Sequence, residues 1–201
     1  MSNSVLGWHF TSQTLRDGRP IPPVGEWLRH KGRVVLCKCG LHMSRRIIDA
    51  LQYAPGPFIH RVEGRGVVQE TEDKLVCRKR RILRSVDGEA MLLQFARECA
   101  MSVLHLWNAP DVVRQYLETR DEALKPSVRQ AIQDAPWSNA LSAALFAVFN
   151  TTYDSAFLCA QDTTRALVKS GEATLEEAVS RLDTRLEAMF WAEAEEQTTS
   201  H

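Results

Sequence analysis

The chain has 201 residues, and its 44% apolar and 25% charged side chains are the proportions of a soluble globular protein of one or two small domains. The charges balance overall but not along the chain: residues 1–88 carry 16 Lys and Arg against 8 Asp and Glu, whereas residues 89–201 carry 9 against 17. A basic first half and an acidic second half predict either attraction between the halves, within or between chains, or a polyanionic partner for the basic half.

The cysteines and the apolar runs indicate the cellular compartment that we expect for this protein. Five cysteines are an odd number, and no segment has the pattern of a secretory signal, so we expect reduced thiols in a cytoplasm rather than a disulfide framework. The most apolar window, residues 140–160, contains Asp154 and further polar side chains, which a bilayer would tolerate poorly. We therefore expect no membrane span.

Short apolar runs predict a sheet in the first 86 residues. The strands are expected at residues 5–10, 34–36, 58–62, 67–70 and 74–83. Ser44 is a suitable N-cap for a single helix over residues 45–53, and Pro55 and Gly56 end that helix. Residues 15–24 are rich in turn residues and predict a loop.

From Asp87 onward the apolar spacing is that of helices, which Pro110, Pro126 and Pro136 separate. Thr174 and Glu177 have the spacing of a capping box and predict the start of the last helix. The apolar stripe of that helix is suited to a helical hairpin or to a homodimer contact, and it consists of Leu175, Val179, Leu182, Leu186, Met189 and Phe190.

These elements predict an α+β fold. A small mixed or antiparallel sheet domain with one helix is expected over residues 1–86, and an α-helical bundle over residues 87–201.

The densest positive run lies in the last predicted strand, at Arg78, Lys79, Arg80 and Arg81. Alternation places Arg78 and Arg80 on one face and Lys79 and Arg81 on the other. Such a strand is too charged for the centre of a sheet unless something covers the charges, so we favour an edge strand protected by its charges. The alternative is a phosphate or nucleic-acid contact, to which Arg61 and Arg65 could add.

Three histidines, His9, His42 and His60, lie in or next to predicted strands. Neutral imidazoles that line a cleft can hydrogen-bond ribose hydroxyls or act as acid and base near pH 7, whereas the plainer interpretation is three separate structural histidines. Glu63 follows His60 by three residues, so on a flat strand the two side chains point to opposite faces.

The spacing Cys37-x-Cys39-x-x-His42 is the nearest approach to a metal-binding motif. Zinc needs about four ligands, and the paired Cys-x-x-Cys is absent, with only Cys77 or His60 as a further candidate ligand. We therefore expect ordinary thiols and no metal site.

Several pieces of the first 122 residues keep the order found in an uncharacterised family that is widespread in bacteriophages and prophages. The pieces are residues 15–18, 36–37 with 40–42, 49–56, 73–76 with 80–83, and 104–110 with 116–119. From about residue 7 to residue 122 the chain resembles that family. The resemblance implies a host cytoplasmic setting and an accessory role, such as host takeover or inhibition of a defence system.

Trp8-His9-Phe10-Thr11 is also similar to the first-strand histidine motif of ADP-ribosyltransferases, and residues 40–44 with the following helix are similar to their next element. The resemblance implies NAD as cofactor, with His9 on a ribose hydroxyl and His42 in the place of a tyrosine that stacks on nicotinamide. Such an enzyme also needs a glutamate to stabilise an oxocarbenium-like transition state, and Glu63 is the candidate.

The sequence thus leaves three hypotheses. The first is a non-catalytic phage-type accessory protein that binds a host macromolecule, most simply a protein, without a cofactor. The second is an NAD-dependent ADP-ribosyltransferase-like enzyme that uses His9, His42 and Glu63. The third is a nucleic-acid-binding protein that uses the basic strand. The second requires His9, His42 and a glutamate to converge on one cleft.

Overall fold

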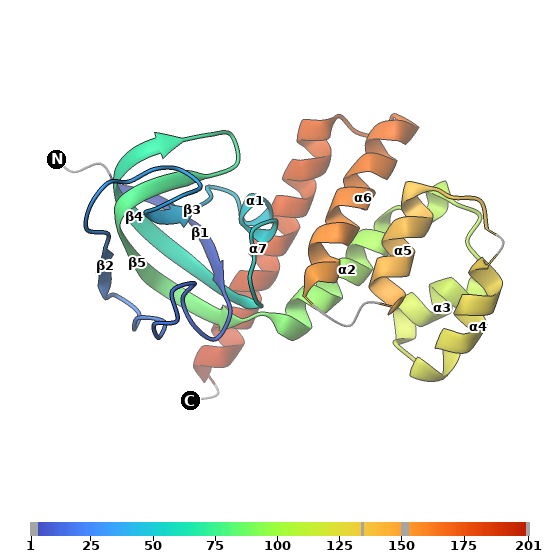
Figure 1. Ribbon diagram of the computed structural model, residues 1–201. Helices are drawn as coiled ribbons and strands as arrows, with labels where there is room; N and C mark the ends of the chain where they lie inside the picture. The colour runs from blue at the N-terminus through green and yellow to red at the C-terminus, as the bar shows by residue number, and fades with distance from the viewer. Residues whose placement is uncertain (1–3, 134, 150–152, 200–201) are drawn as a thin grey trace. The chain divides into compact units, whose positions relative to one another are not determined.

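The computed structural model describes residues 4–133, 135–149 and 153–199 (Figure 1). The strands are β1 (Ser4–Thr11), β2 (Trp27–Arg29), β3 (Leu41–Met43), β4 (Phe58–Glu70) and β5 (Leu75–Asp87). The α-helices are α1 (Ile47–Leu51), α2 (Glu89–Ser102), α3 (Asp111–Thr119), α4 (Lys125–Ile132), α5 (Asn139–Phe149), α6 (Asp154–Ser170) and α7 (Leu175–Thr199). Two short 3-10 helices, Leu104–Leu106 and Glu122–Leu124, complete the order. The predicted α+β class is confirmed.

The chain forms two compact units. The sheet unit consists of the residues up to Gly88 together with those from Arg185 onward, and the helical unit is Glu89–Thr184. The sequence placed everything after residue 86 in one helical domain. The structure differs because the second part of α7 carries Phe190, whose ring meets Trp8 of β1 edge-on at 4.8 Å between centroids.

The sheet is antiparallel, in the order β1-β4-β5-β2, and β3 also pairs with β5. Just after β3, Ser44 exchanges two backbone hydrogen bonds with Trp8 of β1, with N–O distances of 2.7 and 3.0 Å. These bonds join β1, at one edge of the strand path, to the segment that follows β3. Gly7 makes this approach possible, because a Cβ there would lie 2.4 Å from the Ser44 carbonyl oxygen.

The strand β5 is central, which corrects the expected edge strand. It pairs with β4 on one side and with β2 and β3 on the other. Its charges are accommodated individually: Arg80 is buried on the inner face of the sheet, while Arg81 forms an ion pair with Glu63 on the outer face. A basic run is thus compatible with a central strand when hydrogen-bond acceptors or counterions on each face accommodate the cations that point there.

The segment before β3 differs from its prediction. Residues 34–36 form no strand; Val35 makes an isolated bridge to Cys39, and the pairing with β5 begins only at Leu41. The helix α1 starts at Ile47 with Arg46 as its N-cap, because the Ser44 backbone is still extended and bound to β1.

Each unit contains a cluster of buried apolar side chains. The sheet unit buries Met43, Val62, Leu75, Cys77 and Ile82 between its strands. The cluster of the helical unit is rich in alanine, with Ala140, Ala143 and Ala144 contributed by α5. The predicted capping box is present at the start of α7, where the Thr174 N–H donates to Glu177 at 2.8 Å and the Glu177 N–H donates to the Thr174 hydroxyl at 3.3 Å.

The stripe on α7 is mostly covered within the chain. Leu182, Leu186, Met189 and Phe190 are buried, and Leu175 is exposed. Burial of these four side chains within the chain leaves less apolar surface on α7 for a partner, and the homodimer contact stays a prediction. Among the helices that the structure describes, none has the length and apolar character needed to cross a membrane.

Candidate functional site

A cavity of about 920 Å³ opens on the inner face of the sheet, and all its walls belong to the sheet unit. Its floor comes from β1, β3 and Arg80 of β5. Its sides come from the loop after β1, from residues 37–40, and from Tyr53 and Pro55 after α1. Its volume lies within the range of about 300–1,000 Å³ that is usual for small-molecule sites.

Arg80 is the chemically unusual residue of the floor. Only 5% of its surface is exposed, and its guanidinium donates to the backbone carbonyl of His42. Among the described residues no carboxylate forms an ion pair with it. Burial lowers the pKa of Arg80 to about 10, so it is still a cation at neutral pH. A buried charge without a counterion is costly, which makes this position favourable for an anion.

His9 lies beside this cation. Within the described part of the chain its ring has no hydrogen-bond partner, and it stacks on His60, directly opposite on β4, at 6.4 Å between centroids. Burial, followed by the charge of Arg80, holds the pKa of His9 well below its usual value. The imidazole is therefore neutral at pH 7 and offers one N–H donor and one acceptor nitrogen to a ligand.

His60 has a different role. It is fully buried, and its two ring nitrogens are hydrogen-bonded to the hydroxyls of Thr11 at 2.8 Å and Ser85 at 2.9 Å. Burial lowers its pKa to about 4. His60 is absent from the cavity wall, so it is the structural histidine of the three.

His42 lines the cavity but its ring is engaged in the wall. Its Nε2 accepts the backbone N–H of Cys37 at 2.9 Å, which requires the neutral ring. Burial is the main cause that lowers the pKa of His42, and the charges of Arg80, Lys74 and Arg16 add to it against a backbone hydrogen bond to Gly40. The ring therefore holds residues 37–42 in place, and the predicted stacking role is unsupported.

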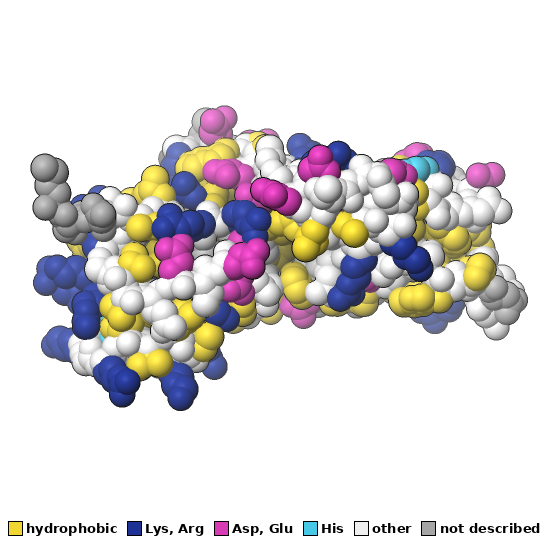
Figure 2. Space-filling model, turned by 90° about the horizontal axis from the view of Figure 1, so that it is seen from above, with side chains coloured by type: hydrophobic (Ala, Val, Ile, Leu, Met, Phe, Trp, Pro, Cys, Tyr) yellow, Lys and Arg dark blue, Asp and Glu magenta, His cyan; other side chains and the backbone are white. Residues whose placement is uncertain are grey.

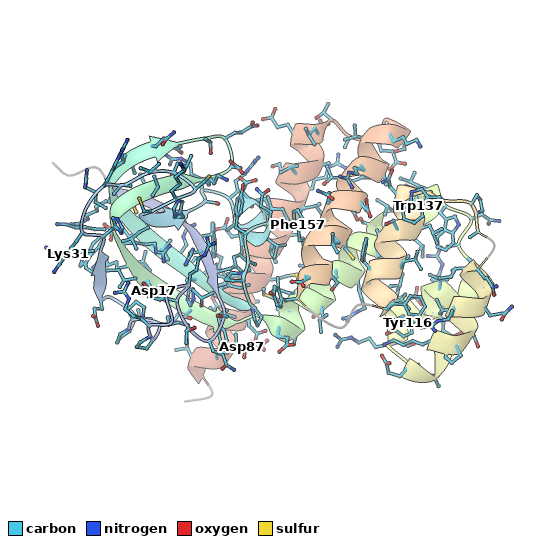
Figure 3. All side chains as sticks on the ribbon, viewed as in Figure 1. Asp17, Lys31, Asp87, Tyr116, Trp137 and Phe157 are labelled. Carbon is cyan, nitrogen blue, oxygen red and sulfur yellow. The ribbon has the colours of Figure 1, made fainter. Side chains whose placement is uncertain are left out.

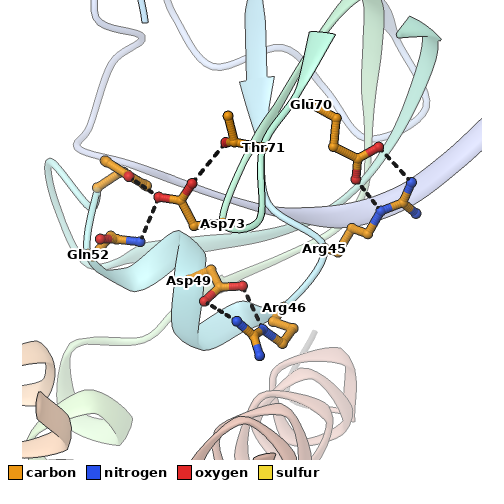
Figure 4. Close-up of polar contacts among 8 residues, drawn as sticks. Arg45, Arg46, Asp49, Gln52, Glu70, Thr71 and Asp73 are labelled. Carbon is orange, nitrogen blue, oxygen red and sulfur yellow. Dashed lines mark hydrogen bonds and ion pairs between the residues drawn. The ribbon is translucent and has the colours of Figure 1, made fainter. Parts of the chain in front are cut away.

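A polar network fixes one side of the cavity (Figure 4). Asp73 accepts hydrogen bonds from Gln52 at 3.2 Å and Thr71 at 2.9 Å, and also from the Tyr53 hydroxyl. Lys74 donates to the same hydroxyl at 2.9 Å, which is the first cause that raises the pKa of Lys74 to about 12. The network ties the end of α1 to the β4–β5 turn and holds Tyr53 and Lys74 at the cavity wall.

The charge of the cavity is positive. The cations in its wall are Arg16, Arg19, Lys38, Lys74 and Arg80. The only carboxylate among the described wall residues is Asp17, which Arg19 holds in an ion pair of 2.7 Å on the loop after β1 (Figure 3). Lys and Arg also gather over the sheet unit on the face drawn in Figure 2.

The structure separates Glu63 from the two cavity histidines. Glu63 pairs with Leu6 across β1, on the outer face of the sheet, and its carboxylate bonds Arg65 at 2.9 Å and Arg81 at 2.6 Å. His9 belongs to the inner face. Glu63 therefore cannot reach a ligand that contacts His9, which corrects its candidacy as a catalytic glutamate.

The predicted binding run is also divided between the faces. Arg80 faces the cavity, and Lys79 and Arg81 face outward with Arg61, which lies 4.6 Å above the Trp8 ring. Arg78 is exposed and donates to the Gly32 carbonyl at 3.3 Å. The run is therefore divided between the two faces of the sheet and does not form one continuous surface.

The cysteines near the cavity form no cluster suited to a metal. The Cys39 thiol donates to the Arg33 carbonyl at 3.0 Å, and the Cys37 thiol is exposed at the cavity. The described residues contain no group of three or more His, Cys, Asp or Glu side chains placed to hold a metal ion.

Sequence reasoning missed Tyr53 and Lys74 as wall residues. Their signal was weak, because they are ordinary residues after a short helix and after a turn, and only the Asp73 network brings them together. The sequence predicted Arg80 as a binding residue only as one of four consecutive cations. Nothing in the sequence distinguished Arg80 from the other three.

Residues 5–94 match the family described as "Domain of unknown function (DUF7666)". This range contains every wall residue of the cavity and most of the sheet unit. No curated protein and no solved structure matches the chain. The phage-type accessory role and a host macromolecule as partner remain predictions.

Proposed function

We propose that the sheet unit binds a phosphorylated small molecule of the nucleotide class in the cavity of His9 and Arg80. The observation that carries the proposal is Arg80: a guanidinium that is 5% exposed, lines a cavity and has no carboxylate partner among the described residues. A phosphate group would supply the missing negative charge, and the planar guanidinium can donate two parallel hydrogen bonds to it.

The rest of the wall suits the remainder of such a ligand. Neutral His9 can accept a hydrogen bond from a ribose hydroxyl or donate one to a phosphate oxygen. The cations Arg16, Lys38 and Lys74 are available to a second anionic group. Tyr53 and Leu28 add an aromatic and an apolar wall for a base.

NAD belongs to this ligand class, and the resemblance to ADP-ribosyltransferases favours testing it first. The cavity supports binding better than transfer. Transfer needs a carboxylate beside the ribose, Glu63 lies on the opposite face, and Asp17 is held by Arg19. The proposal is therefore one of ligand binding, with no catalytic step.

Calorimetry of the full chain with NAD, ATP and adenosine tests the proposal. We expect saturable binding of at least one phosphorylated compound and none of adenosine, with a loss of that binding in Arg80→Met. The matched control is Arg78→Met, two residues away on the same strand and outside the cavity. Equal affinity for adenosine, or undiminished binding by Arg80→Met, would overturn the proposal.

A second readout does not depend on heat. Cys37 lines the cavity with an exposed thiol, whereas Cys39 is half-buried and outside the cavity wall. A bound nucleotide should slow the alkylation of Cys37 by iodoacetamide and leave Cys39 unchanged, as measured by mass spectrometry. Equal protection of both thiols would indicate a general effect of the ligand and contradict binding in the cavity.

A further inference from the structure

The outer face of the sheet carries a second set of cations, arranged by register. Lys79 of β5 lies directly opposite Arg29 of β2 and Arg65 of β4. Residues that are directly paired across antiparallel strands point to the same face, so these three form one cationic row across three strands. Neighbouring strands are about 4.8 Å apart, so the row is about 10 Å long.

The next row on the same face consists of Trp27, Arg81 and Glu63. The guanidinium carbons of Arg65 and Arg81 lie 4.7 and 4.9 Å from the Trp27 ring centroid. Trp27 therefore contacts one cation of each row, Arg65 of the first and Arg81 of the second. The basic run in the sequence did not predict this aromatic side chain among the cations.

The charges on this face are only partly balanced. Glu63 serves both Arg65 and Arg81, while Arg29 and Lys79 are exposed and form no ion pair among the described residues. Like charges that face one another across strands repel, so an anion laid along the row would relieve that repulsion. Four cations and one carboxylate leave a surface complementary to a chain of negative charges.

We propose that this outer face binds single-stranded nucleic acid. A sheet face that combines a track of Lys and Arg with an aromatic side chain is suited to an extended strand, whose phosphates follow the cations and whose bases lie on the sheet. The site is independent of the cavity, because Arg80 and His9 point to the other face. The competing occupant is the acidic helical unit of a second copy.

Fluorescence anisotropy with labelled oligothymidylate and oligouridylate, each of about 20 nucleotides, tests this surface, since one binding site covers about 4–16 nucleotides. Four phosphate contacts predict an affinity that falls about 50-fold between 50 and 200 mM salt, from a slope of about −0.7 per contact. The double variant Arg29→Glu/Lys79→Glu should lose at least about tenfold in affinity and about 1.4 in that slope.

The matched control is Arg114→Glu/Lys169→Glu, which makes the same change in net charge at two exposed positions of the helical unit. It should leave binding within about twofold of the unmodified chain. Equal losses in both double variants would show that net charge alone governs binding and would overturn the proposal. A second result would also overturn the proposal. In it the chain binds no oligonucleotide but forms a salt-sensitive dimer in sedimentation velocity, and Arg29→Glu/Lys79→Glu abolishes that dimer.

Discussion

The inner and outer faces of the sheet treat neighbouring cations of the same strand in opposite ways. Arg80 points inward, is 5% exposed, and has a backbone carbonyl in place of a carboxylate. Lys79 and Arg81 point outward, where Lys79 is exposed to water and Arg81 has Glu63 at 2.6 Å. The comparison shows that neighbouring cations of one run differ widely in burial and in their counterions. Burial and the nearest counterion decide which charge favours a ligand.

The contrast between the faces is sharpest at Arg80 itself. Replacement by Met should weaken nucleotide binding by about 100-fold, because it removes a charged group that is held in a low-dielectric floor. The same substitution should leave the free energy of unfolding unchanged or higher, since an uncompensated buried charge is replaced by apolar surface. Calorimetry and urea unfolding of one preparation measure both effects. A large loss of stability in Arg80→Met would indicate that the guanidinium is structural.

The inner face should also make stability depend on pH. His60 has a pKa of about 4 in the folded chain, below its ordinary value of 6.5, so the unfolded chain binds a proton that the folded chain excludes. Stability is therefore complete above pH 6.5 and decreases as the pH falls towards 4, by about 2–3 kcal/mol. Urea unfolding at pH 7 and at about pH 4.5 should show this dependence reduced in His60→Gln. The control His30→Gln should retain it, and equal profiles of the two variants would contradict the assignment.

The outer face should respond to loss of its carboxylate. Glu63→Gln leaves Arg65 and Arg81 without their shared counterion and should cost about 1–2 kcal/mol of unfolding free energy, less than a fully buried pair because both guanidiniums are partly exposed. Affinity for single-stranded nucleic acid should rise at the same time. A stable variant with unchanged binding would show that Glu63 does not balance this face.

The smallest effect is expected at Lys79. This exposed cation faces Arg29 and Arg65 across the strands, so Lys79→Gln should change the free energy of unfolding by no more than about 0.5 kcal/mol, with a gain as the favoured sign. Chemical denaturation measures the free energy of unfolding of Lys79→Gln and of Arg80→Met, the substitution at the neighbouring residue. A loss above 1 kcal/mol would mean that the outer row is stabilising without a ligand.

The sequence predicted the kind of fold better than the arrangement of the site. Strand β1 and most of β5 were visible as apolar runs, and the Thr174 capping box as a motif, because both signals are local. The expected strands 58–62 and 67–70 are one continuous strand, β4, which Gly64 and Gly66 do not interrupt. Alternation also separated Arg78 and Arg80 from Lys79 and Arg81 correctly. Which set faces a cavity depends on register and on neighbours far along the chain, and no local pattern carries that information.

The incorrect predictions also arose because strand pairing and register depend on residues far apart in the chain. Residues 34–36 are as apolar as a strand, but backbone pairing with β5 was taken by residues 41–43. The β4–β5 ladder contains register shifts after Arg61 and after Val67, which no residue in the sequence announces. Glu63 was the nearest carboxylate in sequence to His60, and strand alternation had already placed it on the other side of the sheet.

The contact between Trp8 and Phe190 has a consequence for how the protein is made. A ribosome adds about 5–20 residues per second. Synthesis of α7, whose Phe190 covers Trp8, is therefore completed on the order of ten seconds after synthesis of β1. During that interval we expect Trp8 to lack the ring that covers it in the folded chain. A chain that ends before residue 185 would keep that surface permanently and is expected to require a chaperone or to aggregate.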